Sequence, residues 1–376
     1  MRGHITKKNN KWYFVVDVGK VNGKRKQKWS KGFDKKKQAE EALAEFLQQL
    51  NSGQYIDVKD STVSDFLNKW LHDYVEIKLA PRTQIRYKEI INNYIIPEFG
   101  HMKLRDLRPI HIQDYYSKLI KKLSPSTVLY HHRVIHKALE QAVKWQYLAH
   151  NPADNVEPPT PDKNEFKVLS AEQLDKLLHY LKQQNHVLYI PVFLAIMTGM
   201  RRGEICGLQW QDVNFDNGTI QVKRQLQRIN GELVLRETKT AGSRRPISLD
   251  DFSVAVLKEH RKKQKENRIF FGSEYHIENL NFVCTWPDGR LIDPDYISHA
   301  FPKVLKELDL PQVRFHDLRH TSATMLLEAG IHPKIVSERL GHTDIRITLN
   351  TYSHALPDMQ KEAAEKLAKK LFSKSR

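Results

Sequence analysis

Cysteines, long apolar runs and nucleotide-binding loops are all scarce in this chain. Only Cys206 and Cys284 occur, too few for a disulfide framework or a zinc knuckle. No uninterrupted apolar run approaches the roughly 20 residues that a spanning helix needs, and the opening MRGHITKKNN lacks the apolar core of a signal peptide. No GxxxxGKS or GxxxxGKT loop and no convincing carboxylate cluster at metal-ligand spacing is present. We therefore expect a cytoplasmic protein that uses no nucleotide and no metal.

Positive charge, by contrast, is in excess. The chain has 61 Lys and Arg against 44 Asp and Glu, a net charge of +17. Such an excess favours a polyanionic partner, because each neutralised phosphate releases condensed counterions. An anionic membrane surface is the competing partner, but the chain has no apolar run to anchor it there. Composition therefore favours a protein that binds nucleic acid.

The length of 376 residues is enough for two or three domains, each with its own core. A stiff polar linker, EPPTP, occupies positions 157–161. Changes in pattern on either side of it predict domains at residues 1–56, 60–158 and 168–376. We expect a mainly α protein with small β-sheets.

The first of these regions is the most basic, with 13 Lys or Arg against 5 Asp or Glu, a net of +8. The segment KWYFVVDV (11–18) predicts a strand, Asn22-Gly23 a type I′ turn, and residues 24–30 a return strand before a helix from about residue 37. A basic run alone is more often a solvated strand face. Here aromatic residues interleave with the cations on a short sheet that can lie in a DNA groove. The residues that we expect to contact DNA are Trp12, Arg25, Lys26 and Lys28.

The second region carries four helical segments and no catalytic constellation. Ser124 is a plausible N-cap for the fourth, with Pro125 at its first position. The cluster His131, His132 and His136 suggests a metal site, but only the last two share the i, i+4 spacing and no HExxH glutamate accompanies them. We do not expect metal binding there.

The third region predicts helices around a short β meander. Ser170 and Gln173 form a capping box. Asn217-Gly218 and Asn230-Gly231 are turn signals for strands at 219–223 and 232–236, and residues 245–249 (RPISL) are a third strand.

Three segments of this region hold cationic and imidazole side chains beside turns. In TGMRRGEICGLQW, Arg201 precedes a helix expected from Glu204 to Trp210, and either Glu204 or a bound phosphate is expected to orient it. In RFHDLRHTSATMLLEAG, His316 and Arg319 share one face at a helix start. In GHTDIRITLNTYSH, His342 follows a helix-ending glycine, and Tyr352 lies ten residues beyond it. Each segment alone is better explained as a surface ion pair or a packing residue.

In this order, however, TGMRRGE, HDLRHT, LGHTDIRIT and NTYSH resemble the signature of the tyrosine recombinase family. Lys239, in ETKTAGSRRPISL, matches the family's β-hairpin lysine by position and context. The resemblance extends upstream, where the second region is similar to the core-binding domain and the first to the arm-type DNA-binding domain of phage and conjugative-element integrases. It implies a mostly helical mixed α/β catalytic domain that ends in a tail helix.

The resemblance implies that Tyr352 attacks a DNA phosphate to form a 3′-phosphotyrosyl link, with neither metal nor ATP. Arg201 and Arg319 would clamp the non-bridging oxygens and Lys239 would protonate the leaving 5′-oxygen. His316 would assist proton transfer at the nucleophile, and His342 would form a hydrogen bond with the phosphate. The residues leave open which group is the base.

The implied role is to integrate and excise a mobile element in the bacterial nucleoid. The implied partners are double-stranded DNA carrying core and arm sites, a homotetramer exchanging tails on that DNA, an excisionase and a host DNA-bending protein. Three alternatives remain: a helix-turn-helix regulator built on residues 326–348, a type IB topoisomerase and a metal-dependent nuclease.

Overall fold

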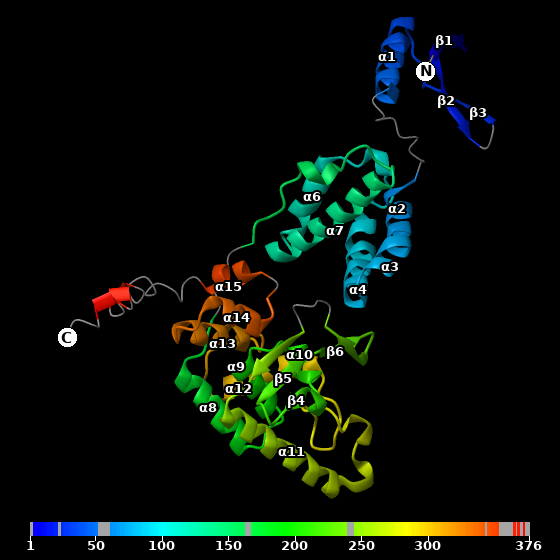
Figure 1. Cartoon of the computed structure of the whole chain (residues 1–376). Coiled ribbons are helices and arrows are strands. Elements are labelled where there is room, and N and C mark those ends of the chain that lie inside the picture. Colours follow the sequence, from blue (N-terminus) through cyan, green and yellow to red (C-terminus); the bar gives the residue numbers. More distant parts are fainter. Residues whose placement is uncertain are drawn as a thin grey trace. The chain divides into compact units, whose positions relative to one another are not determined.

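In the computed structural model, the described residues are 3–21, 24–51, 61–161, 167–238, 244–342, 344–352 and three residue pairs of the tail (364–365, 367–368 and 371–372). The chain separates into two compact units, Met1–Lys163 and Asn164–Arg376 (Figure 1). No helix in these ranges is long and apolar enough to cross a membrane. The division of the first unit into two domains at residues 56–60 stays a prediction, because that segment lies outside the described residues.

A three-stranded antiparallel sheet opens the first unit, with strand order β1-β2-β3. Strands β2 and β3 confirm the predicted hairpin, whereas β1 was not predicted and the Asn22-Gly23 turn lies outside the described residues. Helix α1 covers one face, where Phe14 of β2 contacts Phe46 with ring centroids 5.1 Å apart. The bounds are β1 Gly3–Lys8, β2 Lys11–Val21, β3 Lys24–Trp29 and α1 Lys36–Asn51.

The rest of this unit is helical and has its own apolar core around Phe66, Trp70 and Tyr116. The predicted helix starts are confirmed: the Ser124 hydroxyl accepts from the Thr127 amide at 3.3 Å, and Pro125 opens α7. Five-residue π-helical turns continue α2 into α3 and α4 into α5. The bounds are α2 Val63–Trp70, α3 Glu76–Lys78, α4 Pro81–Ile90, α5 Ile96–Phe99, α6 Pro109–Leu119 and α7 Pro125–Lys144.

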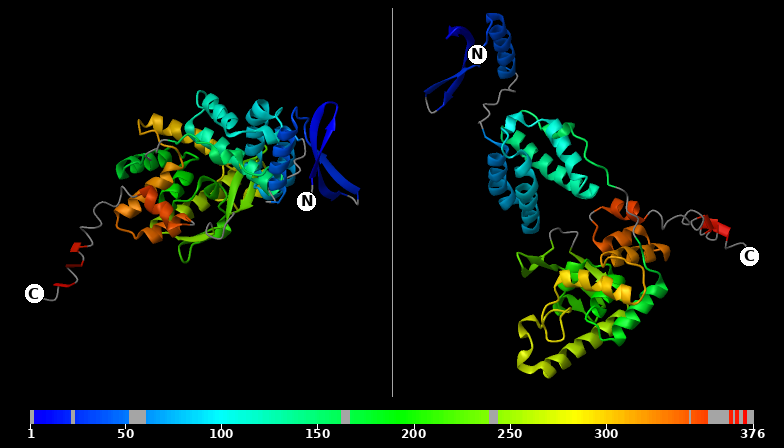
Figure 2. Two further views of the ribbon diagram at one scale, coloured as in Figure 1. Left: turned by 90° about the horizontal axis from the view of Figure 1, so that it is seen from above. Right: turned by 180° about the vertical axis from the view of Figure 1, so that it is seen from behind.

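The second unit has one large apolar core, and a separate smaller apolar cluster is formed by Ala323, Leu327, Val336 and Leu340. The capping box at Ser170 is confirmed, since its amide donates to Gln173 Oε1 at 2.9 Å and its hydroxyl accepts from the Gln173 amide at 3.3 Å. Helix α11 lies at the margin of this unit, away from α13 and α14 (Figure 2). The bounds are α8 Ala171–Gln183, α9 Tyr189–Thr198, α10 Arg202–Cys206, α11 Asp251–Phe271, α12 Pro294–Glu307, α13 Asp317–Glu328, α14 Pro333–Leu340 and α15 Ile345–Tyr352.

The β segments of this unit differ from the predicted meander. The bounds are β4 Val213–Asn214, β5 Thr219–Val222, β6 Arg224–Ile229, β7 Glu232–Glu237 and β8 Arg245–Ser248. Strand β8 pairs with β5, while β6 and β7 form a separate hairpin. Asn230 and Gly231 make the expected turn, with φ of 50° and 86°. The pairing was wrong because turn residues locate strand ends, whereas partners depend on packing between distant segments.

The helix expected from Glu204 to Trp210 is also shorter than predicted, since α10 ends at Cys206. At Gly207 the chain passes against β6, where an added Cβ would lie 2.8 Å from the Leu226 amide nitrogen. This close backbone approach leaves no room for another helical turn with a side chain at position 207.

Candidate active site

The three predicted catalytic segments meet at the carboxyl end of α14. Helix α13 packs on α9 and on α14, and α14 packs on β8 and α15. Gly199 ends α9 with φ of 64°, and Gly341 ends α14 with φ of 69°. These left-handed conformations favour glycine and turn the chain sharply after each helix. Arg201 follows the first of these turns and His342 follows the second, so both residues lie at the same place.

Arg201 is the N-cap residue of α10 and is held by Glu204, as predicted. Its Nη1 donates to Glu204 Oε1 at 2.8 Å and its amide donates to Oε2 at 3.0 Å. The Arg201 side chain is 38% exposed, whereas that of Glu204 is 3% exposed. A buried carboxylate thus orients a guanidinium that still reaches solvent.

Arg319 is placed differently, because it is almost completely buried in the first turn of α13. Its Nη1 donates to the carbonyl of Gly199 at 2.6 Å and its Nη2 to that of Leu340 at 2.7 Å. The side chain therefore joins the loop before Arg201 to the end of α14.

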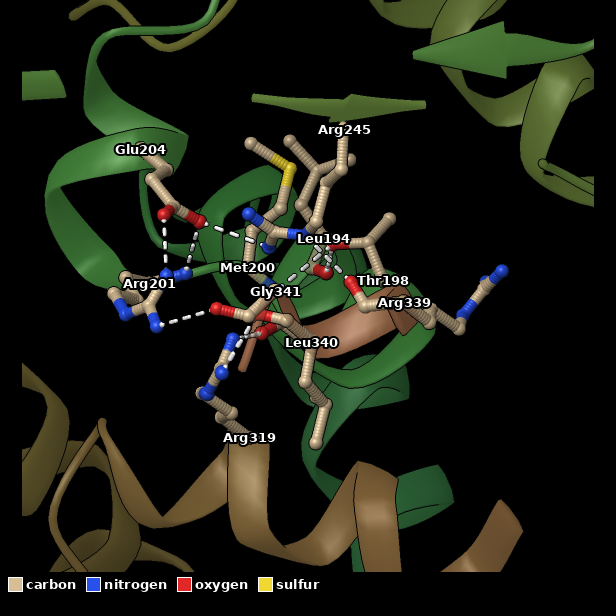
Figure 3. A network of polar contacts seen from close by, with 11 residues as sticks. Leu194, Thr198, Met200, Arg201, Glu204, Arg245, Arg319, Arg339, Leu340 and Gly341 are labelled. Carbon is tan, nitrogen blue, oxygen red and sulfur yellow. Dashed lines mark hydrogen bonds and ion pairs between the residues drawn. The ribbon is translucent and has the colours of Figure 1, made fainter. Parts of the chain in front are cut away.

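Three consecutive carbonyls at this helix end each accept from a different arginine (Figure 3). Arg245 Nε donates to Arg339 O at 2.6 Å, Arg319 Nη2 to Leu340 O, and Arg201 Nη2 to Gly341 O at 3.3 Å. The last carbonyls of an α-helix have no partner within the helix and carry its partial negative charge. The end of α14 therefore gathers cations from three separate segments.

Two of the predicted imidazoles lie beside these cations. Burial, followed by the charges of Arg319 and Arg201, lowers the pKa of His342 to about 4. Partial desolvation of the ring and the charge of Arg319 also lower the pKa of His316, which is otherwise an exposed residue, although Asp317 opposes them. The Nδ1 of His342 lies 2.8 Å from Thr348 Oγ1 of α15. Both rings are therefore neutral at pH 7 and able to accept a proton.

The other two predicted catalytic residues, Lys239 and Tyr352, lie wholly or partly outside the described residues. Lys239 lies outside the described residues, after Thr238 at the end of β7. Tyr352 is the last residue of α15, which packs on α14. The Tyr352 side chain lies outside the described part of the structure. Their catalytic roles stay predictions.

The sequence analysis missed three residues of this site: Arg245, Arg339 and His320. Arg245 occupies an inward position of β8, where Arg245 and Ile247 are buried and Pro246 and Ser248 exposed. A charge at an inward position of an alternating strand was the available signal. The His320 ring lies 5.4 Å from that of His316, and burial and His316 lower its pKa to about 4. No spacing argument identified His320.

In the amino-terminal sheet, Trp12 and Lys28 lie on the face that α1 covers. The amine of Lys36 in α1 lies 6.0 Å from the Trp12 ring centre, and that of Lys28 lies 5.8 Å from the Phe46 ring centre. Trp29, half exposed, lies on the opposite face against Tyr13. The side chains of Arg25 and Lys26 are outside the description, and all four proposed DNA contacts stay predictions.

The histidine cluster of α7 has other partners. The Nδ1 of His131 lies 2.8 Å from the Tyr115 hydroxyl, and that of His132 lies 3.0 Å from the Tyr116 hydroxyl. His136 pairs with Asp154 at 2.8 Å. Across the described ranges, no group of three or more His, Cys, Asp or Glu side chains could hold a metal ion.

Chemically, the end of α14 brings together the partly exposed guanidinium of Arg201, the buried guanidinium of Arg319 and neutral imidazoles beside them. Guanidinium groups suit phosphate oxygens because they are planar, permanently charged and rich in donors. The arrangement can therefore bind a phosphodiester, stabilise added negative charge on it and accept a proton beside it.

Comparisons with known proteins agree with this chemistry. A model of the phage integrase family matches residues 167–359, one of its N-terminal SAM-like domain matches 62–120, and one of an arm DNA-binding domain matches 4–50. A tyrosine recombinase XerC-like protein of Caldanaerobacter subterraneus subsp. tengcongensis is 33% identical, over 96% of this chain and 97% of the relative. The ICEBs1 integrase of Bacillus subtilis is 27% identical, over 78% and 79%.

Among solved structures, the Tn1549 transposon integrase in complex with a circular intermediate DNA shares the fold, with a TM-score of 0.70, 22% identity and coverage of 82% of this chain and 99% of that one. A lambda integrase tetramer bound to a Holliday junction gives a TM-score of 0.56 at 19% identity, covering 90% and 95%. The chain therefore belongs to the phage integrase family of tyrosine recombinases and is a site-specific DNA recombinase.

Proposed function

We propose that Tyr352 is the nucleophile that cleaves DNA, with Arg201, Arg319, His316, His342 and Lys239 around the scissile phosphate. The tyrosine oxygen bonds to phosphorus, the bond from phosphorus to the 5′-oxygen breaks, and that oxygen takes a proton from Lys239. A 5′-hydroxyl of the partner strand then attacks the phosphotyrosine and releases the enzyme. The bond energy is retained in the covalent link, so no ATP is consumed.

The observation that carries this proposal is the convergence of Arg201, Arg319 and His342 on the end of α14. Tyrosine's ordinary pKa of about 10 leaves it protonated at neutral pH, so it needs a base and nearby cations. His316 is assigned as the base because its lowered pKa favours the neutral ring, which is the form that can take the tyrosine proton. The choice of His316 as the base is part of the proposal.

The direct test is a nicked suicide substrate, from which the short fragment carrying the free 5′-hydroxyl diffuses away after cleavage, so that the covalent protein–DNA adduct accumulates. We expect an adduct with the wild type and none with Tyr352→Phe. An adduct with Tyr352→Phe would overturn the assignment. A regulator of the helix-turn-helix type would bind this DNA without any adduct.

The role of Lys239 has a chemical test of its own. Replacing the leaving 5′-oxygen by sulfur gives a leaving group that needs no acid. We expect Lys239→Ala to be inactive on ordinary DNA and active on the thiolate substrate. The absence of rescue would remove Lys239 from the acid role. Activity in EDTA would separate this mechanism from a metal-dependent nuclease.

We further propose that the protein integrates and excises a mobile element, acting on double-stranded core and arm sites in the bacterial cytoplasm and nucleoid. An excisionase and a host DNA-bending protein would set the direction of the reaction. Relaxation of plasmids that lack a specific site would favour a type IB topoisomerase instead.

A tetramer on DNA is the proposed assembly, with the tail after Pro357 docked on a neighbouring protomer. Leu367, Leu371 and Phe372 of this tail are 59%, 62% and 71% exposed, while Met359 and Ala363 lie outside the described residues. Apolar side chains this exposed are suited to a partner surface. Deleting residues 358–376 should impair tetramer assembly on DNA more than DNA binding; an unchanged tetramer would exclude tail exchange.

A further inference from the structure

We propose that Arg245 is a positioning residue for DNA cleavage, which holds the Glu204 carboxylate against Arg201 and thereby sets the direction of the Arg201 guanidinium. The inference rests on the proposed function, in which Arg201 contacts the phosphate. It adds to the site a buried cation that itself has no contact with DNA.

The contacts of Arg245 place it behind Glu204. Its Nη2 donates to Glu204 Oε2 at 3.0 Å while its Nε donates to the Arg339 carbonyl at 2.6 Å. The side chains of Arg245 and Glu204 are 5% and 3% exposed. Because Glu204 Oε1 accepts from Arg201, one buried carboxylate lies between two guanidiniums, of which only Arg201 reaches solvent.

Arg201 depends on this carboxylate for its direction. It precedes a five-residue helix, and a cation at a helix start is electrostatically disfavoured. Its contact to the Gly341 carbonyl is long, at 3.3 Å, and makes a weak restraint. Glu204 supplies the short contact, so its position and charge decide where the Arg201 side chain points.

Glu204 in turn depends on Arg245 for its charge. Burial acts to raise the pKa of Glu204, yet the charges and hydrogen bonds of Arg245 and Arg201 outweigh it and hold the pKa below its ordinary value. Without Arg245 the carboxylate would be buried with one partner that is itself partly exposed. A carboxyl group that takes up a proton there accepts less strongly from Arg201.

Arg245 also ties this pair to the rest of the site. The carbonyl that it holds, Arg339 O, comes directly before the two that accept from Arg319 and Arg201. The Arg339 side chain is itself anchored by donating to the carbonyls of Ser248 and Met197 at 3.0 and 2.7 Å. Arg245 thus fixes Glu204 relative to the helix end to whose carbonyls Arg201 and Arg319 donate.

The test compares single-turnover cleavage by the full-length protein on two suicide substrates, one with the ordinary scissile phosphate and one with a methylphosphonate. A methylphosphonate lacks one charged non-bridging oxygen, so the arginine clamp has less charge to stabilise. On the phosphate substrate, Arg245→Gln should cleave about 100-fold more slowly than wild type, since small misplacements cost this much. On the methylphosphonate substrate, the factor by which it slows cleavage should be at least tenfold smaller. Arg201→Ala should show the same selectivity, and the double variant should be no slower than Arg201→Ala alone.

Two further variants separate positioning from folding. Arg245→Lys keeps the charge but cannot bridge both acceptors, so it should fall between wild type and Arg245→Gln. Arg224→Gln is the matched control, because Arg224 also donates to a buried carboxylate away from the α14 helix end. Its Nη1 donates to Asp212 Oδ2 at 2.9 Å, and the Asp212 side chain is 2% exposed. Arg224→Gln should lower the unfolding midpoint about as much as Arg245→Gln does. Any loss of cleavage rate that it causes should be equal on the two substrates.

A pH profile gives an independent readout. Arg245→Gln should lose cleavage more steeply than wild type as the pH falls below 7, because Glu204 then takes up a proton, whereas Arg224→Gln should run parallel to wild type. Equal losses for Arg245→Gln on both substrates, or additivity with Arg201→Ala, would overturn the positioning role. Failure of the wild type to form an adduct would instead overturn the proposed function, and this inference with it.

Discussion

Gly199 lies so close to Leu340 that a Cβ atom on the glycine would be 2.5 Å from the leucine Cδ2. The contact joins the end of α9 to the end of α14, and Gly199 also has a φ of 64°. Positive φ and close approach both require glycine here. The close approach of the two segments therefore favours glycine at position 199, because any Cβ there would displace the Leu340 side chain.

Gly199→Ala should therefore lower the free energy of unfolding by more than about 2 kcal/mol, with backbone strain of about 1–2 kcal/mol and a steric clash in addition. Gly231→Ala is the matched control, since Gly231 has φ of 86° and nothing within 4 Å of an added Cβ. It should show the strain alone. Equal costs in urea unfolding would mean that the contact with Leu340 does not matter.

Arg319 and Arg201 should respond differently to truncation. Arg319→Ala leaves the buried carbonyls of Gly199 and Leu340 without these donors, and we expect a loss of about 2–4 kcal/mol in unfolding free energy. Arg201→Ala should cost less than half of that, because Glu204 keeps Arg245. Both should strongly slow adduct formation on the ordinary phosphate substrate. A larger stability loss for Arg201→Ala would contradict the burial difference.

Acid should destabilise the second unit through its histidines. In the folded protein the pKa values of His320 and His342 are about 4, below the ordinary value of about 6.5. The unfolded chain therefore binds more protons as the pH falls from 6.5 towards 4, and stability falls with it. The urea midpoint should be lower at pH 5 than at pH 7. His320→Asn should reduce this difference, and His179→Asn, on the exposed face of α8, should not; parallel behaviour of the two variants would contradict the prediction.

The amino-terminal sheet offers a paired test of its two faces. Trp29 is half exposed on the face opposite α1, whereas Trp12 lies on the covered face beside Lys36. Trp29→Ala should weaken binding to arm-site DNA. In place of the DNA contact that the sequence predicts for Trp12, we expect Trp12→Ala mainly to lower thermal stability, because Trp12 lies on the face that α1 covers. Gel-shift titration measures DNA binding and thermal unfolding measures stability. Weaker DNA binding by Trp12→Ala alone would place the DNA on the face that α1 covers, and unchanged binding by both variants would show no role for either tryptophan.

Local patterns in the sequence predicted much of this arrangement. The i, i+3 spacing of Arg201 and Glu204, the capping box of Ser170 and the helix-ending Gly341 all act within a few residues, so sequence spacing reveals them. Arg245 was missed because its partners are 41 and 94 residues away. The pairing of β8 with β5 across an intervening hairpin sets this contact, and hydrophobic alternation carries no information about which strands pair.

The three arginines at the carboxyl end of α14 have a consequence for the safety of the host chromosome. This cluster of cations forms only in the folded unit, because its parts come from β8, from the α9–α10 connection and from α13. A nascent or partly unfolded protein would hold a tyrosine and scattered cations, but not a centre that could break DNA. We therefore expect DNA cleavage only from chains in which this unit has folded.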